Sequence, residues 1–78
     1  MTLRATVTIM LKDGVLDPQG EAVHNALLGL GFAGIEKVTQ GKVIELNLSE
    51  NVDPKRIDEM CKKLLVNEII EDYKVEIS

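Results

Sequence analysis

The chain has 78 residues, with 9 Lys and Arg against 13 Asp and Glu, and aromatic residues make up only 3% of it. This length predicts a single domain over residues 1–78. The acidic balance and the scarcity of aromatic rings argue against nucleic acid as a partner, because phosphates need clustered basic residues and bases need aromatic stacking. No stretch approaches the roughly twenty apolar residues that cross a bilayer, so we expect no membrane association.

A domain this small buries a limited share of its surface, so we expect it to need an extra source of stability. Cys61 is the only cysteine, which excludes an internal disulfide, and no His and Cys cluster is available for a structural metal. Oligomerisation is therefore the expected route. A single unpaired thiol also indicates a reducing compartment, and we expect a cytoplasmic protein.

The first half of the chain predicts a strand, a helix and a hairpin. Apolar residues alternate over residues 3–11, which is typical of a strand buried on one face. Asp17 followed by proline predicts a helix start, and apolar residues at helical spacing extend this helix over about residues 18–30. Two β-rich segments, residues 35–39 and 42–48, are separated by a Gln-Gly pair and predict two strands joined by a tight turn.

The second half predicts a helix and a final strand. Asp53 and Pro54 repeat the cap-plus-proline start, and apolar residues that include Ile57 and Leu64 follow at helical spacing. Alternation over residues 72–77 predicts the last strand. The element order β-α-β-β-α-β predicts an α+β, ferredoxin-like fold, in which four antiparallel strands carry both helices on one face.

Reactive groups are few, and none forms a catalytic pattern. His24 is the only imidazole and lies off the apolar stripe of its helix, so we interpret it as a partly exposed helix residue. Cys61 lies in an apolar stripe, where a thiol packs as a small hydrophobe with a raised pKa. The acidic residues are spread over solvated faces, and the glycines form no phosphate-binding fingerprint. The residues alone therefore indicate a binding or assembly module.

Three segments carry a resemblance to a known family: residues 12–23 (KDGVLDPQGEAV), 41–46 (GKVIEL) and 61–73 (CKKLLVNEIIEDY). Together they resemble PurS, the small subunit of phosphoribosylformylglycinamidine (FGAM) synthase. The run GVLDPQG at residues 14–20 is the most specific part, because no generic strand-to-helix junction demands all seven identities. The resemblance covers nearly the whole chain.

The resemblance implies a role in de novo purine synthesis, where formylglycinamide ribonucleotide, glutamine and ATP become FGAM, glutamate, ADP and phosphate. In the family, the PurQ subunit releases ammonia with a cysteine nucleophile, and the PurL subunit binds ATP and the ribonucleotide. PurS is implied to bridge the two as a homodimer or tetramer and to assist ammonia transfer. No cofactor is then expected on this chain, and ATP and Mg²⁺ are used by the complex.

We predict that partner-facing surfaces lie in three segments, residues 12–19, 41–42 and 67–73, because their identities exceed what capping and turn geometry need. For Asp17 and Gly41 a helix cap and a turn are a sufficient alternative explanation, and Tyr73 could be a core residue with a bonded hydroxyl. No catalytic or metal-binding residue is predicted. The predicted partner-binding residues are Lys12, Asp13, Asp17, Gln19, Gly41, Lys42, Asn67, Glu71, Asp72 and Tyr73.

An ACT-type sensing domain is the alternative, because such domains share the βαββαβ order and bind small molecules at a glycine-bearing first loop. Gly14 in the first loop of this chain fits that reading. A specific, saturable stabilisation by one amino acid or nucleotide, without partner proteins, would favour it.

Overall fold

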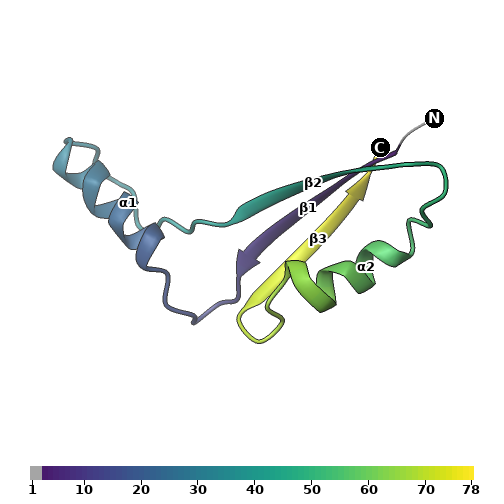
Figure 1. The fold of residues 1–78 in the computed structure, drawn as a ribbon. Coiled ribbons are helices and arrows are strands. Elements are labelled where there is room, and N and C mark those ends of the chain that lie inside the picture. The colour runs from purple at the N-terminus through teal and green to yellow at the C-terminus, as the bar shows by residue number, and fades with distance from the viewer. Residues whose placement is uncertain (1–2) are drawn as a thin grey trace.

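The computed structural model describes residues 3–78 and has three strands in one antiparallel sheet, in the order β2-β1-β3 (Figure 1). No helix in this range is long and apolar enough to span a membrane. The α+β class predicted from the sequence is confirmed. In chain order the elements are β1 (Leu3–Leu11), α1 (Pro18–Gly29), β2 (Lys42–Leu48), α2 (Arg56–Met60), the π-helical turn η1 (Cys61–Leu65) and β3 (Glu71–Ile77).

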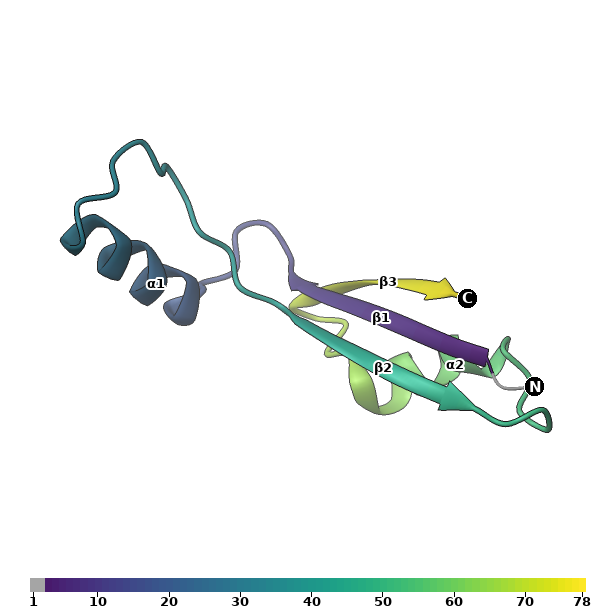
Figure 2. The same cartoon turned by 90° about the horizontal axis from the view of Figure 1, so that it is seen from above.

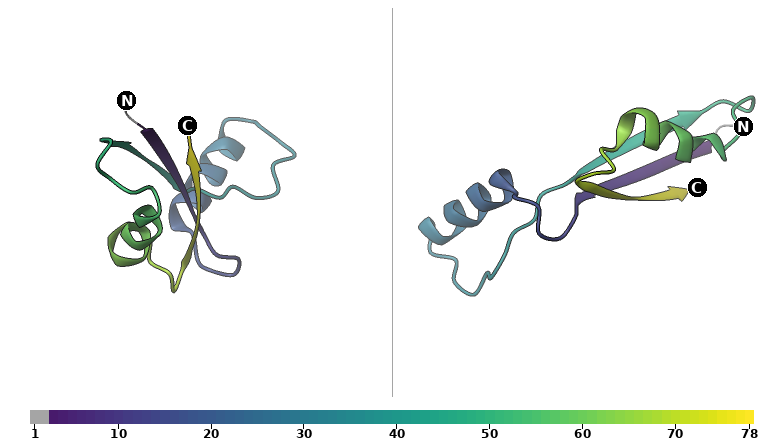
Figure 3. Two further views of the ribbon diagram at one scale, coloured as in Figure 1. Left: turned by 90° about the vertical axis from the view of Figure 1, so that its right-hand side faces the viewer. Right: turned by 90° about the horizontal axis from the view of Figure 1, so that it is seen from below.

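The sheet buries one face against the second helical segment. Val7 in β1 lies opposite Ile44 in β2 and Val75 in β3, so the alternating apolar residues of all three strands share a face. The segment formed by α2 and η1 lies along this face (Figure 3), where Ile57 and Cys61 are fully buried. The predicted inner faces of the strands are therefore confirmed. The buried core consists of Ala5, Val7, Ile9, Leu48, Ile57, Cys61 and Val66.

Helix α1 does not lie on the sheet. It begins as predicted, with Asp17 as its N-cap and Pro18 in its first turn, but it projects beyond the end of the sheet (Figure 2). Gly20 is its only buried residue. The prediction that both helices cover one face is therefore wrong: the short connection after β1 carries the helix away from the sheet. We call α1 with residues 30–40 the arm, and the sheet with α2 and η1 the body.

The predicted strand at Ile35–Thr39 is also wrong. Residues 32–41 contain no assigned strand and run back along α1 to enter β2 directly, so Gln40 and Gly41 do not form a hairpin (Figure 2). A β-rich composition favours extended backbone, but a strand needs a neighbouring strand for its ladder of hydrogen bonds. Here the neighbour is a helix, so the sheet has three strands instead of four.

The second helix begins later than predicted and ends in a wide turn. Asp53 accepts a hydrogen bond from the Lys55 N–H at 2.9 Å, and regular helix starts only at Arg56. At the other end the Val66 N–H donates to the carbonyl of Cys61, which is the i to i+5 pattern of a π-turn. The wider turn leaves Leu64 exposed and brings Val66 into the core, which corrects the predicted inward position of Leu64.

Candidate partner-binding surface

One end of the sheet gathers much of the predicted surface. Because β1 runs antiparallel to both neighbours, its last residues meet the first residues of β2 and β3. This places Lys12, Lys42, Glu71 and Asp72 at the same end, where the arm also leaves the body (Figure 1). We call this region the arm end of the sheet.

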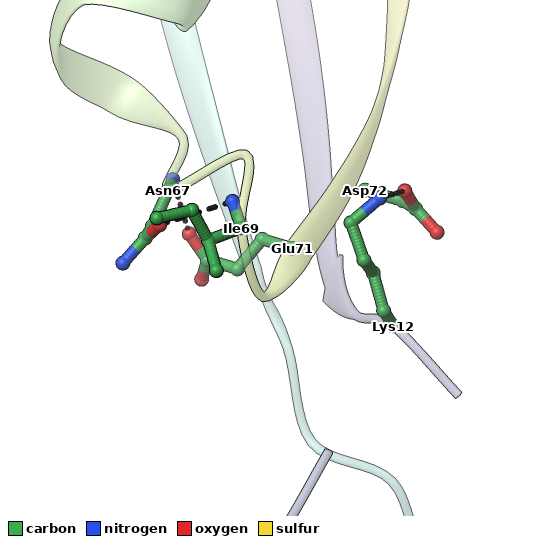
Figure 4. A network of polar contacts seen from close by, with 5 residues as sticks. All are labelled: Lys12, Asn67, Ile69, Glu71 and Asp72. Carbon is green, nitrogen blue, oxygen red and sulfur yellow. Dashed lines mark hydrogen bonds and ion pairs between the residues drawn. The ribbon is translucent and has the colours of Figure 1, made fainter. Parts of the chain in front are cut away.

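Two ion pairs connect the strands at the arm end. The Nζ of Lys12 lies 2.7 Å from the Oδ1 of Asp72 (Figure 4), and the Nζ of Lys42 lies 3.7 Å from the Oε2 of Glu71. The Lys12 N–H also donates to the carbonyl of Ile70 at 2.8 Å. The Lys12–Asp72 pair is exposed, and such a pair contributes little to stability. In the Lys42–Glu71 pair the lysine is exposed, but the Glu71 side chain is only 15% exposed.

The turn before β3 is shaped by Asn67 and Glu71. The Oδ1 of Asn67 accepts from the Ile69 N–H at 3.2 Å, and the Oε1 of Glu71 accepts from the Asn67 N–H at 2.8 Å (Figure 4). The Glu71 N–H donates in turn to the carbonyl of Asn67. These two predicted residues therefore fix the backbone that presents the exposed side chain of Ile69.

Asp17, Gln19 and Gly41 lie at the base of the arm. The Oδ1 of Asp17 accepts from the Gly20 N–H, and its Oδ2 accepts from the Gln40 N–H, both at 2.9 Å. These bonds, that of Gln40 first, hold the pKa of Asp17 below its ordinary value. Gln40 was not identified from the sequence, although the Gln-Gly pair was. It also donates from its side chain to the Oε1 of Gln19 at 2.9 Å.

Asp13 and Tyr73 have different surroundings from the rest. Asp13 is exposed in the loop after β1. Tyr73 packs against the core from β3, and its hydroxyl donates to the carboxylate of Asp58 in α2. This bond raises the pKa of Tyr73 to about 12 and lowers that of Asp58. Tyr73 thus ties β3 to α2, and Asp58 is a second residue that sequence reasoning missed.

The only imidazole and the only thiol both lie in structural positions. The Nε2 of His24 donates to the carbonyl of Ile35 at 2.6 Å within the arm. Cys61 is buried, and burial raises the pKa of its thiol. Across residues 3–78 no group of three or more His, Cys, Asp or Glu side chains could hold a metal ion. The arrangement offers paired charges and exposed apolar side chains, which suit contact with another protein.

A sheet packed on one side and a helix left uncovered define a small α+β interaction module. The chain belongs to the PurS family: residues 4–78 match the family described as PurS, phosphoribosylformylglycinamidine (FGAM) synthase. The resemblance deduced from the three sequence segments is therefore confirmed.

Relatives and solved structures agree with this assignment over nearly their whole lengths. The chain is 40% identical to subunit PurS of FGAM synthase from Methanocaldococcus jannaschii, covering 95% of this chain and 93% of the relative. It is 43% identical to subunit PurS from Mycobacterium leprae, covering 92% and 91%. Its fold is similar to Bacillus subtilis PurS, with a TM-score of 0.88, 40% identity and coverage of 97% and 98%. A chain in the structure of PurLQS from Thermotoga maritima gives 0.84 at 25% identity, covering 100% and 99%.

Proposed function

We propose that this chain is the assembly subunit of FGAM synthase and bridges a PurQ-type glutaminase and a PurL-type synthetase. The observation that carries the proposal is the likeness to PurS proteins over nearly the full length of both chains, including a chain in the PurLQS structure. The complex converts formylglycinamide ribonucleotide, glutamine and ATP into FGAM. In this proposal ATP and Mg²⁺ are used by the partner subunits, and residues 3–78 of this chain supply contacts between subunits and no catalytic group. It works in the cytoplasm, in keeping with its single free thiol.

An adaptor of this kind has a physical task. Ammonia released in bulk water becomes protonated and diffuses away, so the two active sites must be docked with water partly excluded between them. A small subunit that holds the larger ones in register meets this need without chemistry of its own. The charged pairs at the arm end of the sheet are placed for contacts that set such a register.

Self-association is part of the proposal. The arm exposes apolar side chains that the body does not cover, namely Val23 at 40%, Phe32 at 56% and Leu30 at 75% exposed. Burying a side chain of this size stabilises an association by about 1.5–3 kcal/mol. A homodimer or tetramer in which a second copy covers the arm would supply the burial that a chain of this length lacks.

The test is reconstitution with the PurL-type and PurQ-type proteins of the same organism, with glutamine and nucleotide varied. We expect co-elution of the three chains and FGAM formation from glutamine that depends on this chain. FGAM formation from added ammonium salt should not depend on it, because free ammonia bypasses the docking step. A chain that associates under none of these conditions would overturn the proposal, and a saturable thermal shift with one amino acid would favour the sensing alternative.

The Lys12–Asp72 pair allows the predicted partner surface to be tested directly. The single changes K12D and D72K each leave two like charges side by side, and the double change restores the internal pair with its polarity reversed. If the pair only ties β1 to β3, the double variant recovers glutamine-dependent activity. If the two side chains contact partners, we expect the double variant to remain impaired. Recovery in the double variant would therefore remove both residues from the proposed surface.

A further inference from the structure

The chain crosses between body and arm twice, and the two crossings meet at the start of α1, where the Gln40 N–H donates to Asp17. The outward crossing is the loop of residues 13–16, and the return crossing enters β2 at Lys42 (Figure 2). The outward loop contains one local backbone bond, from the Val15 N–H to the carbonyl of Lys12. A loop held so sparsely does not by itself fix where α1 points.

Residues 32–41, which we call the return segment, contact α1 at three places along its length. Farthest from the body, His24 bonds the carbonyl of Ile35. Next, Gly20 meets Val38, where an added Cβ would lie 2.4 Å from the Val38 carbonyl oxygen. The arm is therefore one unit. Its return end is held on the body at Gly41, where an added Cβ would lie 2.4 Å from the carbonyl oxygen of Ile9 in β1, so the attachment beside Gly41 is the one that sets the direction of the arm.

That attachment is made by Asp17, whose two oxygens bond different parts of the chain. Oδ1 accepts from Gly20 in the first turn of α1, and Oδ2 accepts from the Gln40 N–H, two residues before β2. Capping a helix needs only one oxygen, and Asn or Ser serves as well as Asp. The second oxygen is thus free to hold the return crossing against the start of α1.

We propose that Asp17 is a latch that fixes the direction of the arm relative to the body, and that this fixed direction lets the arm meet its partner. The second half of this statement rests on the assembly function proposed above. Both N–H groups donate to the carboxylate oxygens, so they favour its charged form and hold the pKa of Asp17 low. Asp17 acts here as a positioning residue through the backbone of Gln40.

The substitution D17N separates the latch from the cap. The Asn oxygen can still accept from Gly20, but its amide group is a donor and cannot accept from the Gln40 N–H. The matched control is D53N, because Asp53 also precedes a proline but its carboxylate accepts from the Lys55 N–H two residues along the chain, a purely local bond. Far-ultraviolet circular dichroism should show helix content unchanged in both variants, whereas D17A should lose part of α1.

The measurement is nuclear magnetic resonance on the isolated protein, at concentrations where light scattering gives a monomer, so that no second copy holds the arm. In the parent chain and D53N, we expect the residual dipolar couplings of α1 and of the sheet to fit one alignment tensor. In D17N the α1 couplings should shrink and depart from that tensor, and the Gln40 amide should exchange with solvent about tenfold faster or more. An α1 that still shares the tensor of the sheet in D17N would overturn the proposal.

The functional consequence is measured separately. In the reconstituted complex, we expect D17N to bind its partners at least about tenfold more weakly than D53N, with unchanged helix content. Equal affinities for the two variants would overturn the functional half of the proposal. If the parent chain itself fails to bind, the assembly function is wrong, and the latch is still judged by the dipolar couplings alone.

Discussion

The body and the arm are stabilised in different ways. The body holds the whole apolar core, from Ala5 in β1 to Val66 after η1, and its strands are joined by continuous ladders. The arm holds no buried apolar residue and is tied together by His24, Asp17 and the Gly20 contact. The body therefore buries its own apolar residues, whereas the apolar side chains of the arm stay exposed. Because the arm projects beyond the end of the sheet, the molecule is elongated and measures 50 × 27 × 14 Å.

The largest expected effect is on stability, and it distinguishes a buried isoleucine of the body from an exposed one. Ile57 is 1% exposed beneath the sheet, and Ile69 is 85% exposed on the turn before β3. Ile57→Ala leaves a cavity and should lower the free energy of unfolding by about 2–5 kcal/mol. The same change at Ile69 should alter it by no more than about 0.5 kcal/mol. Urea titration of both variants checks this, and equal losses would show that the core lies elsewhere.

The second effect tests the arm as an association surface. Val23→Glu puts a charge on the uncovered face of α1 without weakening the helix, because glutamate has the better helix propensity. We expect self-association to weaken by about 1.5–3 kcal/mol, or about 10- to 150-fold. Asn25→Glu adds the same charge on the other side of the helix and should leave association unchanged. Light scattering across a concentration series distinguishes these outcomes, and identical behaviour of the two variants would contradict the assigned face.

The third effect tests the contact between α1 and the return segment. Ala normally stabilises a helix relative to Gly by up to about 1 kcal/mol, and Gly29→Ala should gain this, because nothing lies near its added Cβ. At Gly20 the added Cβ meets the backbone oxygen of Val38 and the carboxylate of Asp17. The backbone oxygen cannot move aside as a side chain can, and we expect a loss of about 1–3 kcal/mol. Thermal unfolding followed by circular dichroism measures both changes. A gain at Gly20 would mean that the return segment does not hold α1 closely.

Features that depend on local sequence were predicted correctly, and features that depend on which element lies alongside were not. The alternation of Ala5, Val7 and Ile9 and the cap at Asp17 are confirmed, because burial on one face and capping leave direct signals. The strand at residues 35–39 is wrong because a ladder depends on which element lies alongside, and composition does not report that. Leu64 is misplaced because helical spacing assumes a regular turn, and the π-turn changes the spacing.

The candidate surface was predicted more unevenly. Lys12, Lys42, Glu71 and Asp72 come together because antiparallel strands bring their ends to one place, which the element order already indicates. The roles of Gln40 and Asp58 could not be predicted, since each depends on a partner far away in the sequence. Contact of these residues with other subunits stays a prediction.

The smallest expected effect is the pH dependence of one hydrogen bond within the body, between Tyr73 and Asp58. The phenol of Tyr73 donates to the Asp58 carboxylate, so its protonated form is favoured and its pKa is raised to about 12. The stabilisation from this bond is fully present below the ordinary tyrosine pKa of about 10 and is lost as pH rises through about 12. Because Tyr73 is the only tyrosine and the chain has no tryptophan, the ultraviolet absorbance of its phenolate reports this titration directly. Asp58→Asn keeps an acceptor but removes the negative charge, and should move the midpoint back toward the ordinary value. An unchanged midpoint in that variant would show that the tie between β3 and α2 does not run through Asp58.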